Sequence, residues 1–199
     1  MRRYAFRYAL ILSLSAVLLP AIAQAHVDAK SFQLIAGIVH PWINLDSGFT
    51  LVALVLWLCQ AVKATDLIPF ILIAAGLVTG DGVGILLGTS TEPLPIQIVT
   101  LALALCVTLS YLPTRRTWIA VLTFAAFLSG CYAGCDAARD ITSPTLFLVG
   151  VLSGGLIFPL SAGVLMAERT SVMLRVSVRI LGSWIVAIDL MVLALRLRA

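Results

Sequence analysis

Residues 67–87 read LIPFILIAAGLVTGDGVGILL, and this stretch decides the class of the fold. Asp81 is its only ionisable side chain, and a helix needs roughly 20 mostly apolar residues to cross the core of a lipid bilayer. The stretch therefore predicts a membrane-spanning helix. Its glycines, several of them four residues apart, predict close contact with a neighbouring helix, although they would also permit a bend beside a substrate path.

The same reasoning predicts five more spanning helices along the chain. They cover residues 46–62, 94–112, 118–132, 146–166 and 178–197, and the segment 118–132 reaches full length by continuing toward Asp136. Residues 31–39 are too short to span and are expected to end at His40-Pro41, so we predict that they lie at the interface or re-enter. The predicted fold class is all-α, a polytopic bundle of about six transmembrane helices.

The composition agrees with this class. Hydrophobic residues make up 61% of the chain and charged residues 11%, whereas soluble domains carry roughly 25% charged residues. The net charge of +4 includes three arginines close to the N-terminus, and without them ten basic residues stand against nine acidic ones. So small an excess gives no basis for a nucleic-acid partner, and the lipid bilayer is the predicted environment.

The N-terminal segment has the pattern of a secretory signal peptide. Arginines precede an apolar stretch at residues 9–19, and Ala-Gln-Ala at residues 23–25 fits a signal-peptidase site. We therefore predict a signal peptide at residues 1–25 and a single transmembrane helical domain at residues 26–199. The alternative is an uncleaved first transmembrane helix.

Loop charges predict the orientation of the bundle. With the mature N-terminus outside, the inner connections carry six basic residues: Lys63, Arg115, Arg116, Arg169, Arg175 and Arg179. The outer segments carry four: Lys30, Arg139, Arg196 and Arg198. This asymmetry favours a multi-pass protein of the inner membrane with a periplasmic N-terminus. Four aromatic residues near predicted helix ends fit interfacial belts: Trp42, Tyr111, Trp118 and Tyr132.

Four acidic residues stand inside or beside the predicted spans. Asp189 falls at mid-membrane depth, where a carboxyl group must be protonated, paired or open to a wet cavity. Asp46, Asp81 and Asp136 fall near the outer ends of three helices. These three would form either a cation-attracting vestibule or simple polar caps.

Candidate metal ligands lie in the same outer region. Cys131 and Cys135 are four residues apart and share one helix face, so with the adjacent Asp136 they would suit a soft metal such as Cu(I) or Zn(II). Small residues in membrane helices also serve packing alone. After cleavage, His26 would become the N-terminus, where amine and imidazole together can chelate a transition metal, unless this end is a disordered polar tail.

Catalytic motifs are absent from the sequence. It contains no phosphate-binding loop, no dinucleotide fingerprint and no His-Glu-x-x-His pattern. Only His26 and His40 are available for imidazole chemistry. We therefore expect a protein that is not an enzyme.

Residues 40–47 read HPWINLDS and resemble the His-Pro-x-x-Gly-x-Asp-His motif that opens the first helix of the HupE/UreJ family of hydrogenase and urease accessory permeases. The histidine, the proline and the aspartate match, whereas Asn44 and Ser47 replace the glycine and the second histidine. Residues 129–136 read SGCYAGCD, where the family has His-Gly-x-Ala-His-Gly-x-Glu. Both histidines are gone, and the acid survives as Asp136.

Weaker matches extend the resemblance over the whole chain. Residues 94–97, LPIQ, resemble the start of the family's third helix, with Gln97 in place of the usual glutamate. Pro159 stands where a family histidine falls. Residues 179–182, RILG, match the last helix, in which Asp189 stands where glycine is common.

The resemblance implies a membrane protein that transports or handles a divalent transition metal, nickel-like or of altered selectivity, as its substrate; the cofactor is unknown. His40 and Asp46 would form an outer metal site, with contributions from Asp136, Cys131 and Cys135. Most of the family's imidazoles are replaced here by groups that bind nickel weakly or not at all. The alternative is therefore a non-transporting membrane subunit or accessory protein, whose partner is another membrane protein or a second copy of the chain.

Overall fold

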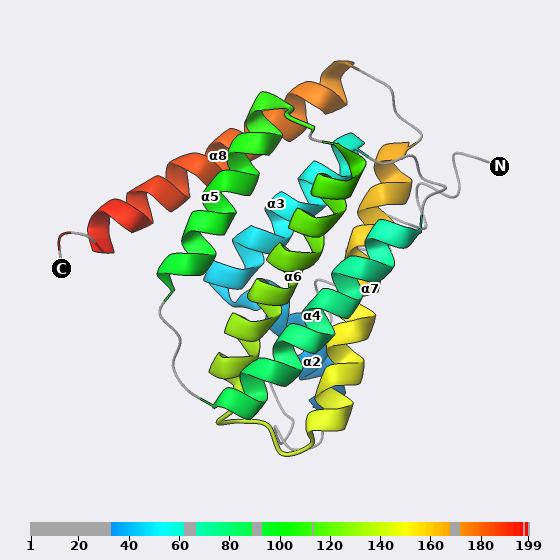
Figure 1. Cartoon of the computed structure of the whole chain (residues 1–199), viewed down its shortest axis with the longest axis vertical. Helices are drawn as coiled ribbons and strands as arrows, with labels where there is room; N and C mark the ends of the chain where they lie inside the picture. The colour runs from blue at the N-terminus through cyan, green and yellow to red at the C-terminus, as the bar shows by residue number, and fades with distance from the viewer. Residues whose placement is uncertain are drawn as a thin grey trace.

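The computed structural model describes residues 33–61, 67–88, 93–112, 114–167, 172–196 and 198. The described residues form α-helices and no strand, so the predicted all-α class is confirmed (Figure 1). The helices are α2 (Gln33–Ile43), α3 (Leu45–Ala61), α4 (Ile68–Leu87), α5 (Leu94–Leu109), α6 (Arg115–Ala137), α7 (Pro144–Ala167) and α8 (Val172–Arg196). The predicted signal peptide and His26 lie outside the described residues.

Four helices, α4, α6, α7 and α8, are long and apolar enough to cross a membrane. The pair α2 and α3 is a further candidate, bent by 76° at the junction, which corresponds to either a broken span or a re-entrant loop. Helix α5 is apolar but only 16 residues long. The chain is thus a helical membrane protein. Of the six predicted spans, α5 is shorter than predicted, and the predicted span 46–62 corresponds to α3, which is long enough to cross only together with α2.

Helix α5 stops short of the predicted end at Leu112. Ser110 adopts a left-handed conformation with φ 53°, and the amide of Tyr111 donates to the carbonyl of Cys106 at 2.8 Å. This pattern satisfies carbonyl groups that a helix end leaves unpaired. The indole Nε1 of Trp57 donates to the carbonyl of Tyr111 at 2.9 Å, so α3 holds the terminating turn in place.

Helix α2 does not end at His40-Pro41, as we predicted, but continues to Ile43. Proline lacks an amide proton, so only the helical bond to the carbonyl of Gly37 is missing. The amide of Asn44 then donates to the carbonyl of His40 at 3.3 Å and completes the last turn. The prediction was wrong because one missing hydrogen bond near a helix end is tolerated.

Helix α3 lies at the centre of the bundle and packs against α2, α5, α6, α7 and α8. Its almost fully buried apolar side chains are Leu51, Ala53, Leu54, Leu56, Trp57 and Leu58. The rings of Trp57 and Trp118 meet edge to face, with centroids 6.1 Å apart. Trp118 is therefore a core residue and not the interfacial aromatic that its position in the sequence predicted. In Figure 1, α8 lies beside α5 at one edge of the bundle.

Helices α4 and α6 meet along small residues. The contact positions are Gly76, Gly80 and Gly84 on α4, and Ala126, Gly130 and Gly134 on α6. A Cβ atom at Gly80 would overlap the backbone carbonyl oxygen of Phe127, and one at Gly134 would overlap that of Asp81. The predicted close contact is confirmed, because no side chain larger than hydrogen fits at these glycines. Gly150 and Gly154 of α7 meet the backbone of α2 in the same way.

Candidate functional site at the break between α2 and α3

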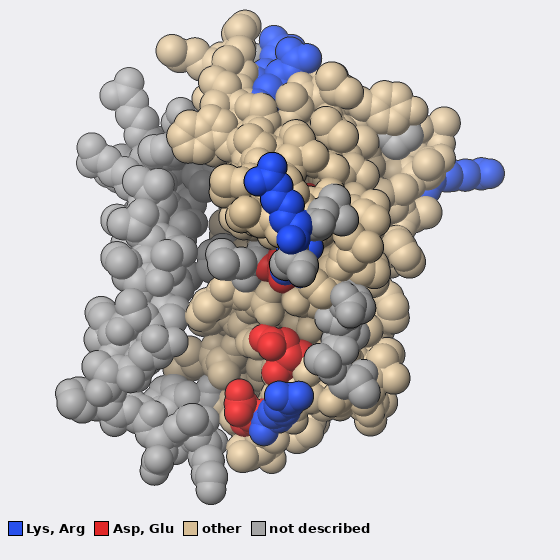
Figure 2. Space-filling view, turned by 90° about the vertical axis from the view of Figure 1, so that its left-hand side faces the viewer, with Lys and Arg blue, Asp and Glu red and all other residues tan. Residues whose placement is uncertain are grey.

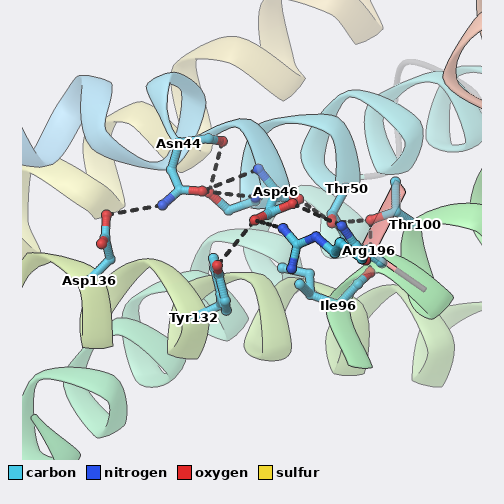
Figure 3. Close-up of polar contacts among 10 residues, drawn as sticks. Asn44, Asp46, Thr50, Ile96, Thr100, Tyr132, Asp136 and Arg196 are labelled. Carbon is cyan, nitrogen blue, oxygen red and sulfur yellow. Dashed lines mark hydrogen bonds and ion pairs between the residues drawn. The ribbon is translucent and has the colours of Figure 1, made fainter. Parts of the chain in front are cut away.

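Asn44 occupies the break between α2 and α3 and links three segments of the chain. Its Oδ1 accepts hydrogen bonds from the amides of Asp46 at 3.2 Å and Ser47 at 3.4 Å, which caps the start of α3. Its Nδ2 donates to Oδ2 of Asp136 at 3.1 Å (Figure 3). Asparagine at the position of the motif glycine therefore fixes the direction of α3 and ties it to the end of α6.

The Asp46 carboxylate collects donors from three other helices. Tyr132 of α6 donates its hydroxyl to Oδ2 at 3.1 Å, and Gln97 of α5 donates Nε2 to Oδ1 at 3.4 Å. Nη2 of Arg196, in the last turn of α8, lies 3.3 Å from Oδ2 (Figure 3). The side chains of Arg196 and Asp46 are 39% and 21% exposed, so solvent weakens the ion pair without removing it. One carboxylate of the predicted set is thus already bound to a cationic group of the protein.

Hydroxyl groups extend the polar cluster into the bundle. Ser47 donates Oγ to the carbonyl of Pro41 at 3.2 Å, and Ser129 of α6 donates Oγ to the carbonyl of Ser47 at 3.3 Å. One turn deeper, the hydroxyls of Thr50 and Thr100 share a hydrogen bond between α3 and α5. These contacts satisfy polar groups that are buried inside a largely apolar bundle.

His40 faces α6 rather than the Asp46 carboxylate. Its Nε2 lies 2.9 Å from the carbonyl oxygen of Ala133, and its ring meets Phe147 edge to face with centroids 5.5 Å apart. A carbonyl oxygen only accepts hydrogen bonds, so Nε2 carries the proton in this pairing. In the neutral ring the lone pair is then on Nδ1, which is the nitrogen left for a metal ion.

Both cysteines of the predicted pair are free thiols on one face of α6. Cys135 is buried and Cys131 half-buried, and the Cys131 sulfur interacts with Cys135 and, electrostatically, with Asp81. Asp136 is exposed and binds Asn44 instead. The thiols therefore lie toward the α4 interface, on a different side of α6 from the acid that follows them in the sequence.

The other two acidic residues are separated by the fold. Asp81 is completely buried, and neither carboxylate oxygen has a hydrogen-bond partner in the part of the chain that the structure describes. It lies between the α4 and α6 backbones, apart from the linked pair Asp46 and Asp136. Asp189 of α8 is 6% exposed and lies within electrostatic range of Asp46 and Arg196.

The predicted ligands do not form one closed metal centre. Within residues 33–61, 67–88, 93–112, 114–167, 172–196 and 198, no three or more His, Cys, Asp or Glu side chains are arranged to hold a metal ion. His40 binds a backbone carbonyl, Asp46 binds Arg196, and the thiols lie by themselves. Figure 2 shows acidic and basic side chains side by side in the lower half of one face.

Sequence reasoning missed three side chains that bind Asp46: Gln97, Tyr132 and Arg196. Tyr132 was interpreted as an interfacial aromatic and Arg196 as a charge of an outer segment. For Tyr132 and Arg196, the spacing from an acidic residue on the same helix could have indicated a role beside the acids. Tyr132 precedes Asp136 by one helical turn, and Arg196 follows Asp189 by two turns on the same face of α8.

Comparison with known proteins gives one match. A family model described as HupE / UreJ protein matches residues 14–192, which is nearly the whole chain. No curated protein and no solved structure matches.

Proposed function

The chain belongs to the HupE/UreJ family, and we propose that it transports or handles a divalent transition metal, with Asp46 as the central carboxylate of an outer metal site. Support comes from the bent pair α2 and α3, which brings Asp46 among polar groups of α5, α6 and α8. Interrupted helices are the usual framework for ion sites inside membrane bundles, because their ends expose polar backbone groups. A carboxylate that holds a guanidinium group can also hold a metal cation.

In this proposal the remaining ligands act around Asp46. His40 contributes Nδ1, Asp136 is coupled to the site through Asn44, and Cys131 and Cys135 form a softer site farther along α6. His26 would add a ligand at the mature N-terminus. The protein works in the inner membrane with its N-terminus in the periplasm, as an accessory or transport protein rather than an enzyme.

Metal uptake by cells that express the full chain tests the proposal. Changing His40→Ala and Asp46→Asn together should reduce uptake of radiolabelled Ni(II) or Co(II) at least about tenfold, the usual effect of disturbing a metal site. Asp140→Asn is the matched control, because it removes an exposed acid just beyond α6 that is not part of the cluster. Immunoblots of membranes establish equal amounts of protein. Uptake unchanged in the double variant contradicts transport through this site.

A second function is favoured by a specific observation: His40 and Asp136 are both engaged by protein groups rather than left open. We propose as the alternative a non-transporting subunit or accessory partner that kept the fold. Deletion would then produce a phenotype in the host, whereas every variant at a ligand position would behave as wild type. A membrane-protein partner, or a second copy of the chain, should co-purify with it.

A further inference from the structure

Asp189 is a buried carboxyl group that the proposed metal site has not used. It lies in α8 and is only 6% exposed. A carboxyl group is expensive to bury inside a membrane bundle without a partner, so such residues commonly mark ion paths.

The geometry of α8 places Asp189 beside the Asp46 cluster. Arg196 follows Asp189 by seven residues, so both lie on the same face, and helical side chains lean toward the N-terminus. Arg196 therefore lies on the Asp189 face of α8, and its Nη2 lies 3.3 Å from Oδ2 of Asp46. Asp189 is within electrostatic range of both residues. Arg196 pairs with Asp46, and a second acidic group, Asp189 of α8, lies near this pair, so one guanidinium group is close to two acids.

Gln97 adds a second buried acceptor at the same place. It is 2% exposed and donates Nε2 to Asp46, while its Oε1 has no hydrogen-bond partner in the described part of the chain. The corner between α3, α5 and α8 therefore offers two carboxylates and one amide oxygen. His40 is the one histidine in the described part of the chain. Its side chain binds the carbonyl group of Ala133 on α6 and does not belong to these three oxygen donors.

We propose that Asp46, Asp189 and the amide oxygen of Gln97 form an oxygen-donor site for a hard divalent cation such as Mn(II) or Mg(II), and that Arg196 occupies this site as a tethered cation until the ion displaces it. The inference rests on the proposed function and narrows its substrate class. Carboxylate and carbonyl oxygens suit Mg(II) and Mn(II), whereas imidazole suits nickel. Two carboxylates also match the charge of a divalent cation better than that of one guanidinium group.

Binding of Mn(II) to the purified full chain in detergent tests the inference, with the electron paramagnetic resonance signal of free Mn(II) as the readout. Wild type should bind Mn(II), Mg(II) should compete, and the control Asp140→Asn, which changes an exposed acid outside the cluster, should bind as wild type does. Asp189→Asn should weaken binding at least about tenfold, as loss of a ligand does. Arg196→Gln should tighten it about tenfold, because the competing internal cation is gone and the binding-competent state is more populated.

Matched variants separate these effects from loss of the fold. Arg198→Gln removes an arginine from the same C-terminal segment without touching the Asp46 contact and should bind as wild type does. Arg196→Lys keeps a positive charge on α8, so it should tighten binding less than Arg196→Gln does. Asp189→Glu keeps the carboxylate and should retain binding.

Two results would overturn the inference in different ways. Mn(II) or Ni(II) binding that disappears in His40→Ala but is indifferent to Asp189→Asn and Arg196→Gln would overturn it and leave the proposed metal function standing. If neither wild type nor Arg196→Gln binds Mn(II), Ni(II) or Co(II), both the inference and the proposed function are wrong.

Discussion

Two faces of α6 hold the bundle together by different means. On the α4 side, Gly130 and Gly134 bring two backbones into contact, and the buried carboxyl group of Asp81 has no hydrogen-bond partner among the described residues. On the α3 side, Ser129 and Tyr132 form hydrogen bonds to α3. Burial of apolar surface does not drive helices together in lipid, so close packing and hydrogen bonds must do so. The chain thus separates the two: the α4 side of α6 packs through glycine contacts, and the α3 side forms the polar cluster in which we propose an ion binds.

The largest expected effect is on the glycine interface. Gly80→Ala should lower the free energy of unfolding by about 3 kcal/mol, the upper end for overpacking, because the new Cβ meets the backbone carbonyl of Phe127 and cannot be relieved by a side-chain rotation. Unfolding by SDS in mixed micelles measures the change. Gly82→Ala is the control, since a Cβ at that position meets nothing within 4 Å. Equal stability of the two variants would mean that α4 and α6 are not in backbone contact.

The polar cluster should respond less strongly to the loss of its central acceptor. Asp46→Ala should cost about 2 kcal/mol, mainly because it leaves the buried amide of Gln97 without an acceptor, while the exposed pair with Arg196 contributes little. Asp136→Ala loses one exposed hydrogen bond and should change stability by less than about 0.5 kcal/mol. The same unfolding assay in SDS measures both changes in stability. Equal losses for the two variants would argue against Asp46 as the centre of the cluster.

At Asp81 we expect a substitution to increase the free energy of unfolding rather than to lower it. Asp81→Leu keeps the forked shape of the side chain and removes an unpaired buried carboxyl group, so it should stabilise the fold by about 1–2 kcal/mol. Asp81→Asn keeps a buried polar group and should give little or no gain. A loss of stability in Asp81→Leu would show that this carboxyl group has a partner and that the glycine interface is not purely a packing surface.

The smallest effect concerns the hydroxyl contact between α3 and α5. A double-mutant cycle of Thr50→Val and Thr100→Val should give a coupling of about 0.6 kcal/mol, the average for hydrogen bonds between membrane helices. Both threonines are buried, so valine changes neither shape nor packing much. The pair Thr79→Val and Thr123→Val, whose hydroxyls each bond within their own helix, should show no coupling. If the effects of Thr50→Val and Thr100→Val on stability are additive, the hydrogen bond between the two hydroxyls does not contribute to the cluster.

Part of the site could be predicted from the sequence. Asp46 stands in a motif of eight consecutive positions and Asp136 ends a second short motif, so both members of the polar cluster could be singled out from the sequence. His40 stands in the first motif too, but the structure turns it toward Ala133. The partners of Asp46 were missed because they are distant in the sequence: Tyr132 is separated from it by 86 positions and Arg196 by 150. The three outer acids were grouped by their depth alone, as a vestibule or as polar caps. Depth does not distinguish Asp81, which faces a helix interface, from Asp46, which faces a polar cluster.

The sequence by itself determined the helical class, the position of most spans and the glycine contacts. All of these depend on local composition, because a bilayer requires long apolar helices and close helix crossings require small residues at regular spacing. Only the tertiary structure decided that α2 continues through Pro41, that His40 turns to Ala133 and that Arg196 binds Asp46. These outcomes depend on which helices become neighbours, and a polar side chain takes whichever partner the neighbouring helix brings within hydrogen-bonding distance.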